Sequence, residues 1–129
     1  MRGASLGALW FGLLAPPLAW SGQELVGYGL AARACGSGGR HFFPMAPGLG
    51  TAELIVSGAA VLLAVMGLIT AGLSWRRSDT ARSETGSAPL GAAFERSRFM
   101  ALAGILLSML FLLAILMNAG GYFLVSPCP

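Results

Sequence analysis

The sequence predicts an all-α integral membrane protein with three transmembrane helices. Hydrophobic residues make up 56% of the 129 residues and charged residues only 10%, and the mean hydropathy is +0.75. Soluble domains are about 25% charged, so this composition excludes an ordinary water-soluble fold. The 19 glycines suit helices that pack closely in lipid, because small side chains let two backbones approach each other.

Two of the three spans follow from length and polarity. The hydrocarbon core of a bilayer requires about 20 apolar residues per helix. Residues 54–73 contain no ionisable side chain, and residues 99–125 carry Asn118 as their only strongly polar side chain. The second segment is long enough to cross with some tilt. We therefore expect transmembrane helices over about 53–75 and 97–125.

The first segment, residues 5–34, allows two interpretations. Its uninterrupted apolar run ends at Trp20 and is followed by Gln23 and Glu24. A cleaved signal over residues 1–22 requires small residues at its end, but proline and tryptophan stand there. A single helix would reach about 45 Å at about 1.5 Å per residue, enough to cross the whole membrane. The helix is the preferred interpretation, and the signal peptide stays open as the alternative.

The arginines predict the orientation, because cytoplasmic loops carry the positive charge. With the N-terminus inside and the C-terminus outside, six arginines are cytoplasmic (Arg2, Arg76, Arg77, Arg82, Arg96 and Arg98) and two are external (Arg33 and Arg40). The chain is then one membrane domain with an outer loop over 35–52 and a cytoplasmic loop over 76–96. The loop composition is typical of a partly flexible linker, and residues 92–98 are expected to start the third helix early.

No residue pattern indicates catalysis or a cofactor. The chain contains one histidine, His41, no CxxC pair and no glycine-rich phosphate loop followed by lysine. A metal site built from His41, Cys35 and Cys128 would still need a fourth ligand. The net charge of +3 is explained by the arginine bias across the membrane and does not indicate nucleic-acid binding. We expect a protein that is not an enzyme and that binds neither cofactor nor metal.

The two cysteines predict a disulfide. In the expected topology Cys35 follows the first helix and Cys128 follows the third, both outside the membrane. An oxidising periplasm permits bridge formation. A bond between them would connect the outer ends of these two helices.

Polar residues in the spans are the remaining candidates for a site: Gln23, Glu24 and Asn118. Intramembrane acids usually face the protein interior, form pairs or take up a proton. Pro16 and Pro17 are expected to kink the first helix, so that Gln23 and Glu24 turn toward helix partners. Glu24 then either stabilises packing, protonated or hydrogen-bonded to Gln23, Tyr28 or Asn118, or relays a proton or ion. Both roles stay open.

Several short motifs together resemble a known group of proteins. They are GLLAPPLAW and QELVGYGLAARAC in the first segment, WRR after the second, and ERSRFMAL and SPC around the third. This layout resembles small three-helix membrane proteins encoded beside bacterial haem-copper cytochrome c oxidases. The resemblance implies a location in the bacterial cytoplasmic membrane, beside a respiratory complex, without a redox centre in this chain.

Two functions follow as expectations. The first is a non-catalytic accessory or assembly subunit of a respiratory complex, whose partners are other membrane subunits and the lipid bilayer. Small residues suited to lateral packing support it: Gly58, Ala59, Gly67, Ala71, Gly72, Ala101, Gly104 and Ser108. These residues can equally serve contacts among the protein's own helices. The alternative is a transport component or protomer that uses Glu24 as a proton or ion site.

Overall fold

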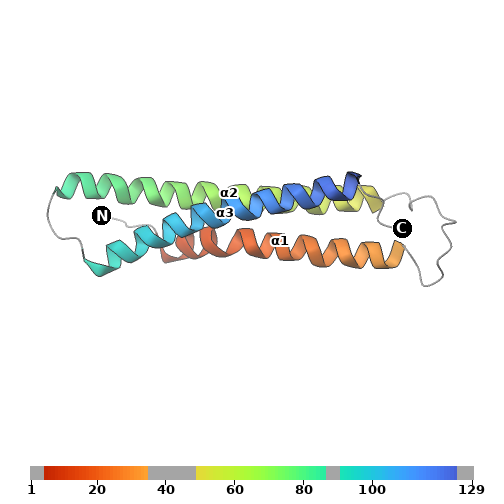
Figure 1. The fold of residues 1–129 in the computed structure, drawn as a ribbon. Helices are drawn as coiled ribbons and strands as arrows, with labels where there is room; N and C mark the ends of the chain where they lie inside the picture. The colour runs from red at the N-terminus through yellow and green to blue at the C-terminus, as the bar shows by residue number, and fades with distance from the viewer. Residues whose placement is uncertain (1–4, 35–48, 87–90, 125–129) are drawn as a thin grey trace.

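The fold is all-α, as the sequence predicts, and consists of three long helices. The computed structural model describes residues 5–34, 49–86 and 91–124, with helices α1 (Leu6–Ala34), α2 (Leu49–Thr85) and α3 (Ala92–Leu124). The helices lie side by side in an elongated bundle, in which α1 and α3 run in the same direction and α2 runs in the opposite one (Figure 1). Two of them are long and apolar enough to cross a membrane, over Gly50–Thr85 and Ala92–Gly121.

The helix ends follow local rules of capping. Ser5 precedes α1 and accepts a hydrogen bond from the Ala8 backbone N–H on its Oγ, at 3.3 Å, which satisfies one of the free donors of the first turn. α2 ends at Thr85, and Gly86 has a φ of 64°, a left-handed conformation that glycine adopts without steric cost. α3 begins at Ala92, where the sequence analysis expects the third helix to start.

The interior of the bundle is a seam of mostly small residues at alternating spacings of three and four. This heptad spacing keeps one side of each helix facing its partners, as in coiled coils and helix bundles. On α2 the buried positions are Glu53, Ser57, Ala60, Ala64, Gly67, Ala71, Ser74 and Ser78, on α1 they are Leu9, Gly12, Pro16, Ala19 and Gln23, and on α3 they include Ala101, Gly104, Ser108 and Ile115.

The three backbones come closest where α1, α2 and α3 each contribute glycine. A Cβ added to Gly104 would lie 3.1 Å from Ala71 Cβ, and one added to Gly12 would lie 3.3 Å from the same atom. At Gly67 an added Cβ would lie 3.0 Å from Pro16 Cγ. No side chain larger than hydrogen fits at Gly67 without displacing its neighbour. Small residues therefore determine how closely the helices pack here.

Five of the eight small residues singled out from the sequence pack inside the bundle: Gly67, Ala71, Ala101, Gly104 and Ser108 are buried. Gly58 and Ala59 are exposed, and Gly72 is half-buried with open space where its Cβ would be. The interior contacts among the protein's own helices thus account for most of this set. The other three remain available for contacts with lipid or with another protein.

Large apolar side chains point outward. Residues such as Leu25, Leu62, Leu106 and Met117 each expose more than half of their surface, although alanine and serine are buried. Water-soluble proteins bury their large apolar side chains, because the hydrophobic effect favours removing them from water. The arrangement of this bundle is the one expected when the surroundings are themselves apolar.

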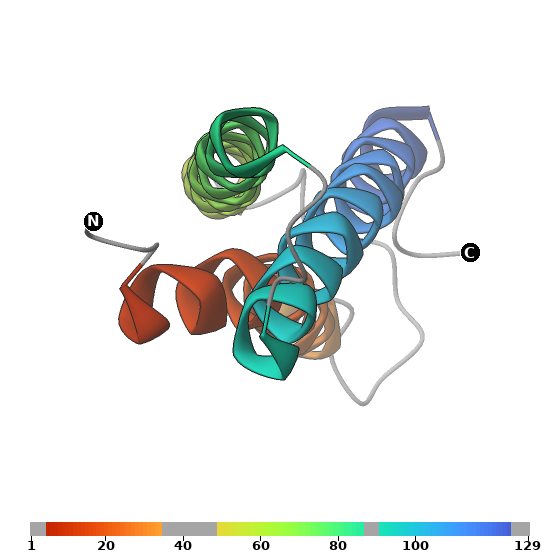
Figure 2. The ribbon, with the colours of Figure 1, turned by 90° about the vertical axis from the view of Figure 1, so that its left-hand side faces the viewer.

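Two prolines redirect α1. Pro16 and Pro17 lie inside the helix, and in Figure 2 the red first part of α1 runs across the view whereas its orange part is seen end-on. Proline has no N–H, so the Gly12 carbonyl loses its helical donor at Pro16. That carbonyl oxygen would lie 3.4 Å from a Cβ on Gly104, so it lies close to the backbone of Gly104 on α3.

A cytoplasmic loop is expected over 76–96, but α2 continues as a helix to Thr85. Arg98 of α3 places its guanidinium 4.6 Å from the centre of the Trp75 ring and 3.6 Å from Asp79 Oδ1. Ser74 and Ser78 stay buried and donate to backbone carbonyls four residues earlier, at 2.9 and 3.0 Å. Packing against α3 thus keeps helical a segment whose composition resembles a linker.

Replacing Gly67 by alanine should destabilise the bundle. The new methyl group would meet the rigid ring of Pro16, and overpacking of this kind costs about 1–3 kcal/mol. Gly72→Ala on the same helix has open space and removes an unfavourable glycine, so it should be neutral or stabilising by up to about 1 kcal/mol. Thermal unfolding of both variants in detergent, followed by circular dichroism, measures the difference. Equal stability of the two variants would contradict the described packing.

Candidate functional site

A polar cluster lies buried between α1 and α2 and consists of Gln23, Ser57 and Glu53. The Gln23 Nε2 group donates to Ser57 Oγ at 2.9 Å, and the Ser57 hydroxyl donates to Glu53 Oε1 at 3.3 Å. Gln23 is 1% exposed and Glu53 2% exposed. The three side chains therefore form one continuous hydrogen-bond chain that connects two helices inside the bundle.

The chain leaves two buried oxygens without partners. Gln23 Oε1 and Glu53 Oε2 have no hydrogen-bond donor among the described residues. Ser57 cannot help either oxygen, because its hydroxyl has one hydrogen and already donates it to Glu53 Oε1. Unsatisfied buried polar atoms are rare in proteins because they lose their hydration without compensation. The cluster is thus an incomplete network that can accept a hydrogen or a positive charge.

The other buried serines of α2 differ from Ser57 in this respect. Ser74 and Ser78 satisfy their hydroxyls locally on the backbone carbonyls of the preceding turn. Only at the other end of α2 does a buried serine connect side chains of two helices. Among the described residues, the hydrogen bond between buried side chains of two helices is therefore at this end of the seam, whereas the other end has the partly exposed ion pair of Arg98 with Asp79.

Gly27 leaves space beside the buried carboxyl group. A Cβ on Gly27 would lie 3.6 Å from Glu53 Oε2 and 3.9 Å from Oε1, and no other atom lies within 4 Å of that position. The contact is ordinary van der Waals contact, so glycine is not required for steric reasons. Its consequence is that the unpartnered Oε2 lies beside the backbone of Gly27 rather than beside a side chain of that residue.

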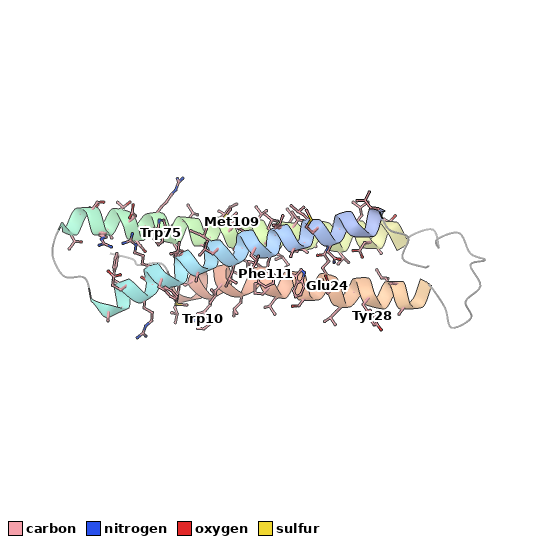
Figure 3. The ribbon with its side chains drawn as sticks, viewed as in Figure 1. Trp10, Glu24, Tyr28, Trp75, Met109 and Phe111 are labelled. Atoms are coloured by element: carbon pink, nitrogen blue, oxygen red, sulfur yellow. The ribbon has the colours of Figure 1, made fainter. Side chains whose placement is uncertain are left out.

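The expected inward turn of the Gln23-Glu24 pair is confirmed for Gln23 and wrong for Glu24. Gln23 is buried against α2, whereas Glu24 is exposed (Figure 3). Neighbouring residues of a helix point about 100° apart, so only one of the pair can occupy the narrow seam. The Gln23 amide forms its hydrogen bond with Ser57 and not with Glu24, and Tyr28 is also exposed.

The remaining candidate residues are placed as follows. Asn118 is half-buried on α3. Cys35, Cys128 and His41 lie outside the described residues, so the disulfide stays a prediction. Within the described ranges, no group of three His, Cys, Asp or Glu side chains is placed to hold a metal ion.

Glu53 is not among the residues predicted as a site, although it is the first residue of the expected span over 53–75, directly before the uncharged run 54–73. The sequence feature that could have identified Glu53 is the heptad spacing of α2. Counting back from Ala64 through Ala60 in steps of four and three reaches Ser57 and then Glu53, on the same side of the helix. Extending the pattern of buried small residues past the apolar run would have placed the carboxyl group in the interior.

An apolar groove follows the outer side of the seam between α1 and α2. It has a volume of about 650 Å³ and is lined by α1 from Trp10 to Val26 and by α2 from Ile55 to Leu63. Among its lining residues, Gln23 and Trp10 are the two whose side chains carry an N–H donor. At about 1.5 Å per residue, its α1 wall extends over about 24 Å and its α2 wall over about 12 Å.

No protein-family model, no characterised protein and no solved structure matches this chain.

Ser57→Ala should destabilise the bundle more than Ser108→Ala. The first change removes the partner of both Gln23 Nε2 and Glu53 Oε1, and losing such a buried interhelical bond costs about 1 kcal/mol. Ser108 is fully buried and its hydroxyl has no partner, so replacing it by alanine removes an unsatisfied group and should be neutral or stabilising. Unfolding of both variants in the same detergent is the measurement. A Ser108→Ala variant that is the less stable of the two would contradict this account.

Proposed function

We propose that all three helices cross the membrane and that the bundle extends beyond it at the arginine-rich end. Exposed large apolar side chains surround an interior of small and polar residues, which supports a lipid environment. Trp75 and the exposed Arg76 and Arg77 provide one membrane boundary, since aromatic and basic residues favour the interface. Residues 76–85 of α2 then project into the aqueous phase.

Aromatic side chains support the same placement for α1. Trp10 and Tyr28 are exposed toward opposite ends of the helix (Figure 3). The 18 residues between them correspond to at most about 27 Å, close to the hydrocarbon thickness of about 30 Å. Glu24 lies one turn before Tyr28, so its exposed carboxyl group can reach the headgroup region. This placement makes α1 the third span, in addition to the two helices that are long and apolar enough to cross a membrane.

The arginine bias sets the proposed orientation, with the α2–α3 connection in the cytoplasm and the C-terminus outside. A periplasm-active reporter fused after Pro129 should therefore be active, and the same reporter inserted after Gly86 should be inactive. A cytoplasm-active reporter at the two sites provides the reciprocal control. Activity of the first reporter at both sites, or at neither, would contradict the three-span topology.

Within this placement we propose a non-catalytic accessory or assembly subunit of a bacterial respiratory membrane complex. The observation that carries the proposal is the α1–α2 groove, an apolar surface that the protein's own α3 does not cover. Its α1 wall, about 24 Å long, exceeds the half-thickness of about 15 Å available to a lipid chain in one leaflet. We propose that it receives a transmembrane helix of a partner subunit. The choice of a haem-copper cytochrome c oxidase as the complex rests on the sequence resemblance.

A transport role through Glu24 is the second candidate. The exposure of Glu24 favours it in one respect, because a carboxyl group on the outer surface can meet the same residue of neighbouring copies in a ring. The position of Glu24 near the membrane boundary favours simple anchoring instead. The two cases differ in oligomeric state, since a ring requires a homo-oligomer.

A photo-crosslinking side chain at Ala59 should capture an oxidase subunit in native membranes. Ala59 is exposed and lines the groove, whereas Met109 is exposed on α3 and does not line it, so Met109 provides the matched control position. Deleting the gene should also lower the amount of assembled oxidase in the membrane. Crosslinks only between copies of this chain, with normal oxidase levels in the deletion strain, would exclude the subunit role.

A further inference from the structure

The buried carboxyl group of Glu53 plays no part in the subunit role proposed above. It lies inside the bundle, 2% exposed, and its only described hydrogen-bond donor is Ser57. An ionised carboxylate in such a position is costly unless several donors or a positive charge compensate it. Among the described residues no arginine forms an ion pair with it. The carboxyl group of Glu53 therefore needs a hydrogen or a positive charge from outside the described residues.

We propose that Glu53 is a proton-binding site, and that the bound proton reverses the direction of the hydrogen-bond chain Gln23–Ser57–Glu53. With Glu53 ionised, the Gln23 amide donates to the Ser57 hydroxyl and this hydroxyl donates to the Glu53 carboxylate. The structure shows these two hydrogen bonds, at 2.9 and 3.3 Å. This arrangement leaves two acceptors, Gln23 Oε1 and Glu53 Oε2, and two acceptors cannot satisfy each other.

Proton uptake resolves this mismatch. A proton from the aqueous phase binds Glu53 Oε1, and the new O–H donates to Ser57 Oγ. The Ser57 hydroxyl then donates to Gln23 Oε1, once the amide has turned by 180°, which its nearly symmetrical shape allows. The groups left over are Gln23 Nε2, a donor, and Glu53 Oε2, an acceptor. The proton thus replaces one of the two unsatisfied acceptors by a donor and removes the charge of the buried carboxyl group, without requiring a water molecule inside the bundle.

The site lies near one end of the bundle. Glu53 lies one helical turn, about 6 Å, from the first residue of α2, so a small local opening at this end would expose its carboxyl group. Toward the other end, 32 residues or about 48 Å away, the seam of α2 continues with Ala60, Ala64 and Gly67. These residues carry no group that binds a proton. The proton therefore enters and leaves on the same side, so the site reports the pH of one compartment and does not conduct.

The charged surroundings of the cluster are sparse. On α1 the titratable neighbour is Glu24, which is exposed. On α3 the register set by Gly104 against Ala71 brings Asn118 to the level of Ser57, and asparagine does not titrate. Among the described residues, Glu53 is thus the buried group of this region whose charge can change with pH.

Infrared difference spectroscopy of the full chain in lipid vesicles, between acidic and alkaline buffer, tests the proposal. The carboxylic acid C=O band of Glu53 should appear in the wild type and in Glu24→Gln, disappear in Glu53→Gln, and shift in Ser57→Ala, which loses the hydroxyl that the acid contacts. Glu53→Gln keeps the shape and neutrality of the protonated acid, so the bundle should remain folded. A band that persists in Glu53→Gln, or a wild type without any buried acid band, would overturn the proposal.

A second measurement follows the reversal itself. Gln23 is the only glutamine of the chain, so glutamine labelled with ¹³C at its side-chain carbonyl reports on this residue alone. Its C=O band should move on acidification in the wild type, because Oε1 gains the Ser57 hydrogen, and should stay unchanged with pH in Ser57→Ala, which keeps Glu53 but lacks the hydroxyl through which the reversal reaches Gln23. A labelled band that does not move in the wild type would show that the chain does not reverse. Neither measurement depends on the identity of the partner complex.

Discussion

The close approach of three helices along a seam of small residues is the constraint on which the rest of the structure depends. A Cβ on Gly12 or Gly104 would lie 3.3 or 3.1 Å from Ala71 Cβ, and one on Gly67 would lie 3.0 Å from Pro16 Cγ, so the three helices are in tight contact at these glycines. Lipid tails are as apolar as leucine, so the hydrophobic effect gives little reason for helices to associate in a membrane, and dispersion contacts between closely packed backbones take its place. The large apolar residues are consequently left for the outer surface.

This constraint also explains how proline is accommodated in α1. Pro16 is buried against Gly67 in the narrowest part of the seam, and the carbonyl that it frees faces the backbone of Gly104. A helix interior normally loses about 3 kcal/mol at a proline. Here Gly67 of the facing helix α2 provides the space for the proline ring. The kink is thus part of the packing and redirects the first turns of α1 away from the bundle axis.

The general architecture could be predicted from the sequence because it depends on composition and on long apolar runs. The extent of α1 and the start of α3 at Ala92 follow from local polarity and capping. The continuation of α2 past residue 75 was not predicted, because Arg98 of another helix contacts Trp75 and Asp79 there. Glu53 was missed for a related reason. It lies outside the uncharged run 54–73, and only the register of the folded seam shows that it faces inward.

The two ends of the bundle differ in whether their buried polar groups have hydrogen-bond partners. Groups with partners stabilise the fold, whereas groups without partners can bind a proton or a water molecule. At the arginine-rich end, Ser74 and Ser78 are satisfied by their own helix and Arg98 has both an aromatic ring and a carboxylate to contact. At the other end, Gln23 and Glu53 depend on a single serine and retain unpartnered oxygens. A satisfied polar network holds helices in one arrangement, whereas an incomplete one changes its hydrogen bonds when a proton or a water molecule arrives. The buried residues of α2 between the two ends are alanine and glycine, which bind no proton, so they do not form a proton pathway along the bundle. The chemistry of this bundle is therefore confined to the end at which α2 begins.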